Sequence, residues 1–193
     1  TPNWGGTWIQ DTARSTYNDY ELDIDYNFDS IYVLMTNNLT TSNENLRIRY
    51  TALGTWGTNV AWKQYNPAGE SFPEYNGCLA VNRPTNAMVV TYTANESSNL
   101  NIKYTYAANG ITWVAHNVLT NQSYNESRSY ISGSNQQSGA FRVIFVSSGT
   151  SFDSVIYMST SSIATGFSGR TLVSRVHDAT TSLAPCVSGY MLN

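Results

Sequence analysis

The sequence predicts an all-β fold, and three observations lead to this prediction. Apolar and polar residues alternate along most of the chain, as Leu100, Ile102, Tyr104 and Tyr106 do in residues 99–107. Clusters of Asn, Ser, Gly and Pro separate the alternating segments, which indicates short turns. No stretch keeps the 3.6-residue apolar period of a helix. We therefore expect an antiparallel meander, either closed as a β-barrel or folded as a β-sandwich.

The expected strands follow in order from the alternating segments. They are placed at about 54–62, 77–83, 87–95, 99–107, 111–119, 140–147, 153–160 and 170–176. Residues 121–139 are polar and predict a long exposed loop or a weak edge strand. Residues 1–52 are also strand-rich, and nothing in the composition marks a boundary, so residues 1–193 are expected to form one domain.

The low content of charged residues indicates which partners and which location to expect for the protein. Charged residues make up 12% of the chain and the net charge is −3, so no basic surface is expected to attract nucleic acid or anionic lipid. There is no transmembrane run, and the sequence begins at Thr1 without Met, which predicts a processed, secreted protein. The low charge also favours a homo-oligomer. The Asn-x-Ser/Thr sequons predict N-glycosylation at Asn38, Asn95, Asn121 and Asn125.

The two cysteines favour a disulfide rather than a metal site. Cys78 and Cys186 stand far apart in the sequence and have no neighbouring Cys or His. Zinc sites need closely spaced ligands, so no metal is expected.

A constellation of short motifs resembles the lipocalin family. The segment "LGTW" at 53–56 matches the family's Gly-x-Trp, with Trp56. Residues 143–159 resemble its Asp-containing turn, with Asp153, and residues 171–178 offer the closing Arg175. The resemblance implies a calyx-shaped, up-and-down barrel over residues 53–177, followed by a C-terminal tail at 178–193. It also implies that Trp56 plugs the barrel under Arg175, and Cys78 and Cys186 resemble the family disulfide.

This resemblance implies that an apolar small molecule binds inside the barrel. The ligand would be a retinoid, carotenoid, bilin, fatty acid or steroid, carried for transport, storage or coloration, and a bound chromophore or lipid would be the only cofactor. The candidate lining residues are Tyr92, Tyr104, Tyr106, Trp113, Phe141, Phe145 and Tyr157, with His116 as a polar anchor.

No paired catalytic carboxylates, nucleophile elbow or phosphate-binding Gly loop stand out, so the sequence predicts a binding protein and not an enzyme. The alternative function is a β-sandwich lectin or cell-surface recognition module, which low charge and abundant Asn and Tyr would suit equally well.

Two internal similarities call for a structural explanation. Gly-Thr-Trp occurs at residues 6–8 and again at 54–56, and residues 28–50 echo residues 152–176, as if a hairpin had been duplicated. Just before residues 28–50, Asp23 and Asp25 alternate with apolar residues. On a strand this pattern predicts a solvated acidic face opposite an apolar one.

Overall fold

The computed structural model of the chain describes residues 18–40, 43–52, 63–65, 73–96, 99–110, 112–148 and 153–176. Twelve β-strands lie within them. Sheet 1 contains β1 (Asn18–Tyr26), β2 (Ser30–Thr40), β3 (Asn43–Ala52) and β4 (Lys63–Tyr65). Sheet 2 contains β5 (Glu74–Asn82), β6 (Ala87–Glu96), β7 (Asn99–Ala107) and β8 (Val114–Val118). Sheet 3 contains β9 (Asn125–Gly133), β10 (Phe141–Ser148), β11 (Asp153–Thr160) and β12 (Ser168–Val176).

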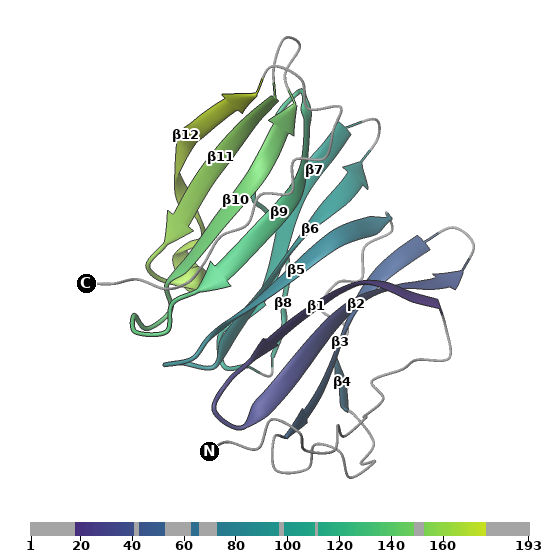
Figure 1. Cartoon of the computed structure of the whole chain (residues 1–193), viewed down its shortest axis with the longest axis vertical. Coiled ribbons are helices and arrows are strands. Elements are labelled where there is room, and N and C mark those ends of the chain that lie inside the picture. The colour runs from purple at the N-terminus through teal and green to yellow at the C-terminus, as the bar shows by residue number, and fades with distance from the viewer. Residues whose placement is uncertain are drawn as a thin grey trace, which may run out of the picture.

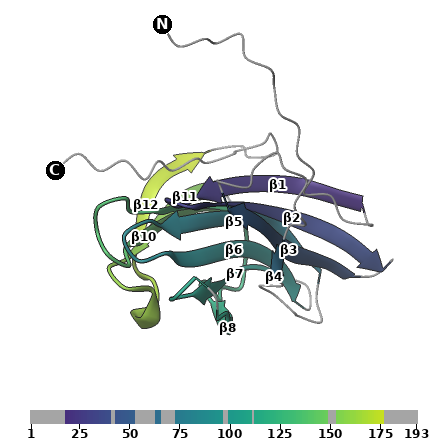
Figure 2. The ribbon, with the colours of Figure 1, turned by 90° about the horizontal axis from the view of Figure 1, so that it is seen from below.

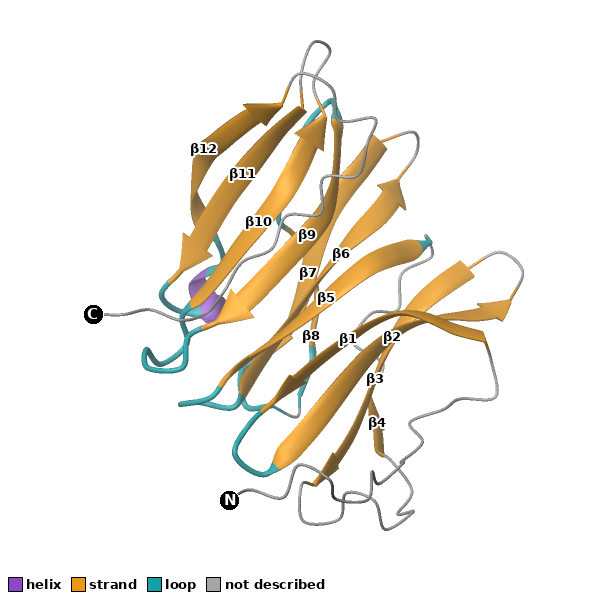
Figure 3. Ribbon diagram, viewed as in Figure 1, coloured by secondary structure: helices purple, strands orange, loops and turns teal. Residues whose placement is uncertain are grey.

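Each sheet is an antiparallel meander of four strands that follow one another along the chain. The three sheets follow one another across the molecule, with sheet 2 in the middle (Figures 1 and 2). Figure 3 shows strands almost throughout, with one short 3₁₀ turn at Ile163–Thr165 between β11 and β12. No helix among the described residues is long and apolar enough to cross a membrane.

Sheet 2 is covered on both faces, which explains the composition of its strands. The residues of β6 from Ala87 to Ala94 are all buried, whichever face they occupy. One apolar core lies between sheets 1 and 2, and a second lies between sheets 2 and 3. Tyr92 belongs to the first core and Phe145 to the second, and both are fully buried. Complete burial of such a side chain stabilises the fold by about 1.5–3 kcal/mol.

The all-β, antiparallel prediction is confirmed, but the barrel is not. Among the described strands, pairing stops after every fourth strand and no sheet closes on itself, so packed open sheets fit the sandwich alternative better. The first strands of the sheets lie side by side, β1 beside β5 and β5 beside β9. Between β1 and β5, hydrogen bonds from backbone N–H groups to side chains replace the backbone-to-backbone hydrogen bonds of a continuous sheet. The backbone N–H groups of Leu79 and Val81 on β5 donate to Asp23 Oδ2 at 2.7 Å and to Asp25 Oδ2 at 2.6 Å.

This contact reverses the polarity expected for β1. The sequence predicted that the acidic face would be solvated, yet Asp23 and Asp25 face β5. The apolar residues Leu22, Ile24 and Tyr26 are the exposed ones, at 68%, 63% and 51%. The carboxyl groups of Asp23 and Asp25 exchange water for backbone N–H groups of β5, so this polar face can pack against that strand with its acceptors satisfied.

The sequence echo does not follow the repetition of the sheets. Residues 28–50 contain β2 and most of β3, the second and third strands of sheet 1, whereas residues 152–176 contain β11 and β12, the third and fourth strands of sheet 3. The predicted strands from 77 onward agree with β5 to β8 and β10 to β12, and the segment 121–139 contains a full strand, β9. Residues 6–8 and 54–56, which hold both Gly-Thr-Trp copies, lie outside the described residues.

Sheets 2 and 3 approach each other closely at Gly133, and this contact gives a prediction about stability. A Cβ atom at Gly133 would lie 2.4 Å from the carbonyl oxygen of Val81, much closer than real Cβ contacts. Gly133→Ala must therefore push β9 away from β5 and should destabilise the fold by about 1–3 kcal/mol, as overpacking does. Chemical denaturation measures the change. Ser132→Ala, one residue away, is the control and should change stability little; equal stability of both variants would contradict the close approach.

Asp25 generates a prediction about pH. Burial raises the pKa of Asp25 from its ordinary value of 3.8, and this outweighs the N–H bonds and the Arg83 charge that lower it. A raised pKa in the folded state means that stability is greatest when the carboxyl is protonated, and is lost as pH rises through that pKa. Asp25→Asn cannot ionise, so its melting temperature relative to wild type should be higher at pH 7 than at pH 3. The reverse trend would show that hydrogen bonds dominate.

Candidate functional site

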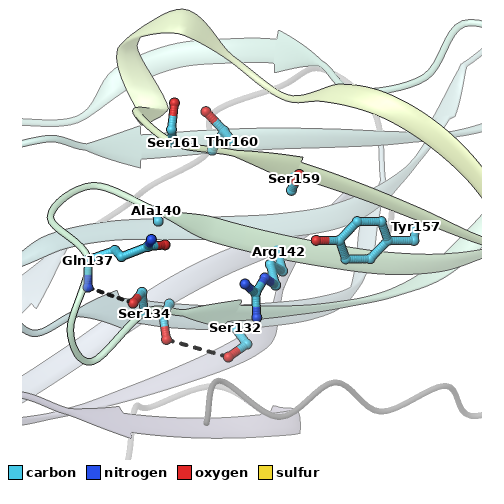
Figure 4. Close-up of a pocket in the computed structure, with 10 residues that line it drawn as sticks. Ser132, Ser134, Gln137, Ala140, Arg142, Tyr157, Ser159, Thr160 and Ser161 are labelled. Carbon is cyan, nitrogen blue, oxygen red and sulfur yellow. Dashed lines mark hydrogen bonds between the residues drawn. The ribbon is translucent and has the colours of Figure 1, made fainter. Parts of the chain in front are cut away.

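A polar hollow of about 190 Å³ lies on the open face of sheet 3, the face turned away from sheet 2. Its lining comes from the end of β9, the β9–β10 turn, the start of β10 and the end of β11 (Figure 4). The lining residues are Ser132, Gly133, Ser134, Gln137, Ala140, Arg142, Tyr157, Ser159, Thr160 and Ser161.

Strand alternation places the side chains of Ser132, Arg142, Tyr157 and Ser159 on the face turned away from sheet 2. Arg142 stands directly opposite Ser132 on β9 and Ser159 on β11, so the three form a row across the sheet. The neighbouring residues Phe141 and Val143 point the other way, into the core with sheet 2. Tyr157 stands opposite Ile144, in the next row. The sheet therefore presents hydroxyl groups, a guanidinium and an aromatic ring together.

A buried side chain of sheet 2 fixes the turn that forms the rim. Asn82 Nδ2 donates to the carbonyl oxygens of Ser134, Gln137 and Ala140 at 3.1, 2.7 and 3.2 Å. Its Oδ1 accepts the N–H of Gly139 at 3.1 Å. Within the turn, Ser134 Oγ accepts the Gln137 N–H at 2.8 Å, a contact drawn in Figure 4. The rim is thus held in place before any ligand arrives, which lowers the entropic cost of binding.

The chemistry of the lining suits a ligand with many hydroxyl groups. Serine and threonine hydroxyls both donate and accept hydrogen bonds, the Gln137 amide does the same, and Arg142 adds a forked donor. The Tyr157 ring offers an apolar surface next to these polar groups. The described lining residues include no Asp or Glu, so the two carboxylates that most glycoside hydrolysis requires would have to come from other residues.

A second polar cluster lies at the other end of sheet 3. Glu126 on β9 is fully buried and accepts Arg170 Nη2 at 2.6 Å. The same Nη2 reaches Tyr124 at 3.2 Å and Ser147 at 3.4 Å, and the guanidinium lies 5.4 Å from the centre of the Phe145 ring. Because Glu126 neutralises the arginine and ties it to the sheet, this cluster is a structural ion pair.

Most of the predicted calyx residues lie in the cores instead of lining one cavity. Tyr92 and Trp113 belong to the core with sheet 1, on one face of sheet 2. Tyr104, Tyr106, Phe141 and Phe145 belong to the core with sheet 3, on its other face. The hydroxyl of Tyr92 is hydrogen-bonded to His116 Nδ1 at 2.8 Å. Tyr157 alone lines the hollow.

The remaining predicted residues are placed as follows. Trp56 and Cys186 lie outside the described residues, so the Trp56–Arg175 contact and the disulfide stay predictions. Arg175 is exposed on β12, and Asp153 begins β11.

Cys78 is a buried thiol whose Sγ accepts the N–H of Ile131 at 3.4 Å, and burial raises the pKa of this thiol well above the usual value. The sequons at Asn95, Asn121 and Asn125 are exposed, and Asn38 lies on β2. Among the described residues, no three His, Cys, Asp or Glu side chains gather as metal ligands would.

Sequence comparisons give no relative: neither a protein-family model nor a curated protein matches the chain. Solved structures do match. The catalytic domain of the Coprinopsis cinerea GH62 alpha-L-arabinofuranosidase aligns with a TM-score of 0.53 and 12% identity, over 90% of this chain and 56% of that one. Hadza microbial sialidase Hz136 aligns with a TM-score of 0.50 and 6% identity, over 74% of this chain and 35% of that one. The chain thus spans about a third to a half of these proteins, and at such identities the likeness concerns the fold alone.

These findings correct the function expected from the lipocalin resemblance. A carrier for a retinoid, carotenoid or other apolar ligand requires a closed calyx, and the three sheets in the described part of the chain form none. The structural neighbours are carbohydrate-active enzymes and not lipocalins. The prediction that the chain is not an enzyme is overturned by the same neighbours, since both are named as enzymes.

The Glu126–Arg170 pair generates a prediction about stability. Arg170→Ala would leave a fully buried carboxylate without its cation. Losing one partner of a buried pair should cost about 3 kcal/mol, at the low end of the known range because the Arg170 side chain is 31% exposed. Denaturant titration measures the loss, and the double variant Arg170→Ala with Glu126→Gln should recover part of it. A loss no larger in the single variant than in the double would show that Glu126 needs no counter-charge.

Proposed function

We propose that this chain is a carbohydrate-binding domain and that the hollow on sheet 3 holds the sugar. The observation that carries the proposal is the lining, which places five Ser or Thr residues, the Gln137 amide, Arg142 and the ring of Tyr157 around one small space. A sugar offers hydroxyl groups around its edge and a weakly apolar face of C–H groups. The first would bond the hydroxyls and the amide, and the second would lie against the ring.

The fold supports the same class of ligand. Both solved structures reported above act on carbohydrates by their names, one being a sialidase and the other an arabinofuranosidase. Similar folds carry many different functions, so this likeness raises the expectation of a sugar ligand without identifying the reaction. It agrees with the recognition module named as the alternative in the sequence analysis, and not with an apolar cargo.

Arg142 favours a sugar that carries a carboxylate. A guanidinium binds a carboxylate through two parallel N–H···O bonds, which is a stronger and more specific contact than any it makes with a neutral hydroxyl. Among the described residues that line the hollow, none is acidic and would repel such a ligand. We therefore expect an acidic sugar such as sialic acid to bind more tightly than its neutral counterpart.

Titration calorimetry with 3′-sialyllactose, and with lactose as the neutral comparison, tests the proposal. Wild type should bind sialyllactose and should bind lactose at least tenfold more weakly. Arg142→Met should remove this preference, because the forked contact worth about 1.4 kcal/mol or more is lost. Tyr157→Ala should weaken both ligands, because the ring is part of the lining.

Arg175→Met is the matched control for charge, since Arg175 is an exposed arginine of the same sheet outside the hollow. It should bind like wild type. Binding that Arg142→Met and Tyr157→Ala leave unchanged would place the sugar elsewhere, and the absence of binding to sialyllactose, lactose and arabino-oligosaccharides would contradict a carbohydrate-binding role.

A further inference from the structure

The open face of sheet 3 continues beyond the hollow. The row of side chains that lines the hollow consists of Ser132, Arg142 and Ser159. The next row on the same face consists of Tyr130, Ile144 and Tyr157. Residues two apart on a strand point to the same face, so the two rows lie about 7 Å apart. Tyr157 belongs to the second row and also lines the hollow, which makes the two rows one continuous surface.

The second row has an aromatic ring at each end. Adjacent strands are about 4.8 Å apart, so Tyr130 on β9 and Tyr157 on β11 stand about 10 Å apart, with Ile144 of β10 between them. The Tyr130 side chain is 36% exposed, and Ile144 and Tyr157 are half-buried. The row therefore offers solvent a flat, partly apolar strip directly beside the polar hollow.

Charge differs between the two rows. The first row contains the guanidinium of Arg142, which suits a carboxylate. Among the described residues of the second row, which Thr171 continues onto β12, none is charged. Tyrosine rings present an apolar surface to the C–H face of a sugar and a hydroxyl to its edge. The second row therefore suits a neutral sugar, whereas the first suits an acidic one.

We propose that the site takes an oligosaccharide whose acidic terminal sugar enters the hollow and whose adjoining neutral sugar lies over the second row. The distance between the rows is comparable to the length of one sugar ring, so two linked sugars can occupy them in turn. Tyr130 then determines how strongly an oligosaccharide is preferred over a single sugar, because it lies in the second row and outside the hollow. This inference rests on the proposed function and extends the same site.

A tyrosine beside an isoleucine of the next strand also stabilises a sheet by packing, so the test has to separate ligand contact from packing. Titration calorimetry compares 3′-sialyllactose with the methyl α-glycoside of N-acetylneuraminic acid, which carries the acidic sugar alone. Wild type should bind the trisaccharide more tightly. Tyr130→Ala should weaken trisaccharide binding by about three- to tenfold and leave binding of the single sugar unchanged.

Two further variants serve as controls. Tyr130→Phe keeps the ring and should bind both ligands like wild type. Tyr26→Ala removes a tyrosine that is 51% exposed on β1 of sheet 1, and it should also bind both like wild type. An unchanged circular dichroism spectrum of Tyr130→Ala verifies that the sheets still form.

Saturation-transfer NMR with 3′-sialyllactose locates each sugar. In wild type, protons of both the sialic acid and the adjoining galactose should receive saturation from the protein. In Tyr130→Ala, the galactose signals should fall relative to those of the sialic acid. A purely structural role of Tyr130 would lower both sets of signals together.

The possible failures are distinguishable. If the single sugar binds as tightly as the trisaccharide, or if Tyr130→Ala binds the trisaccharide like wild type, the second-row site is overturned. Loss of single-sugar binding in Arg142→Met would still uphold the hollow in either case. A wild type that binds neither ligand would overturn the acidic-sugar site and its extension together.

Discussion

The architecture depends on how the backbone N–H groups at the edge of each sheet's first strand find hydrogen-bond acceptors. Strands β1, β5 and β9 lie side by side, which would ordinarily invite a continuous backbone ladder. The side chains of Asp23 and Asp25 accept the Leu79 and Val81 N–H groups instead, and Cys78 accepts that of Ile131. Because these N–H groups are occupied, the sheets remain separate and pack face to face. That arrangement creates two apolar cores and leaves the hollow on the open face of sheet 3.

The same constraint connects stability with the candidate site. Asn82, at the end of β5, reaches the β9–β10 turn and holds three of its carbonyl groups. Gly133 lets β9 approach β5 closely enough for this contact. The rim of the hollow is therefore part of the packing between sheets 2 and 3, and the strands that bury Phe141 and Val143 on one face present Arg142 on the other.

Much of the fold could be predicted from the sequence, because alternation reports which residues share a face of a strand. Strands β6 and β7 were located almost to the residue. Alternation does not report what covers each face, and in β6 both faces are buried, so Tyr92 could be assigned equally well to a calyx or to a core. It also does not report how strands group into sheets: eight strands from Trp56 suggested a barrel, whereas the chain changes sheet after every fourth strand. At the site, only Tyr157 was among the predicted residues. For residues 121–139 the polar composition left a loop and a weak edge strand equally open, and β9 is an edge strand of sheet 3.

Amide hydrogen exchange at β5 and β9 tests the edge contact most directly. The account predicts slow exchange for the Leu79, Val81 and Ile131 N–H groups, since each donates to a side chain of the preceding sheet. In Asp25→Ala, exchange at Val81 should accelerate while the N–H groups of the β6–β7 ladder stay protected. Exchange at Val81 that is fast in the wild type, or unchanged in Asp25→Ala, would contradict the claim that side chains close the edges of these sheets.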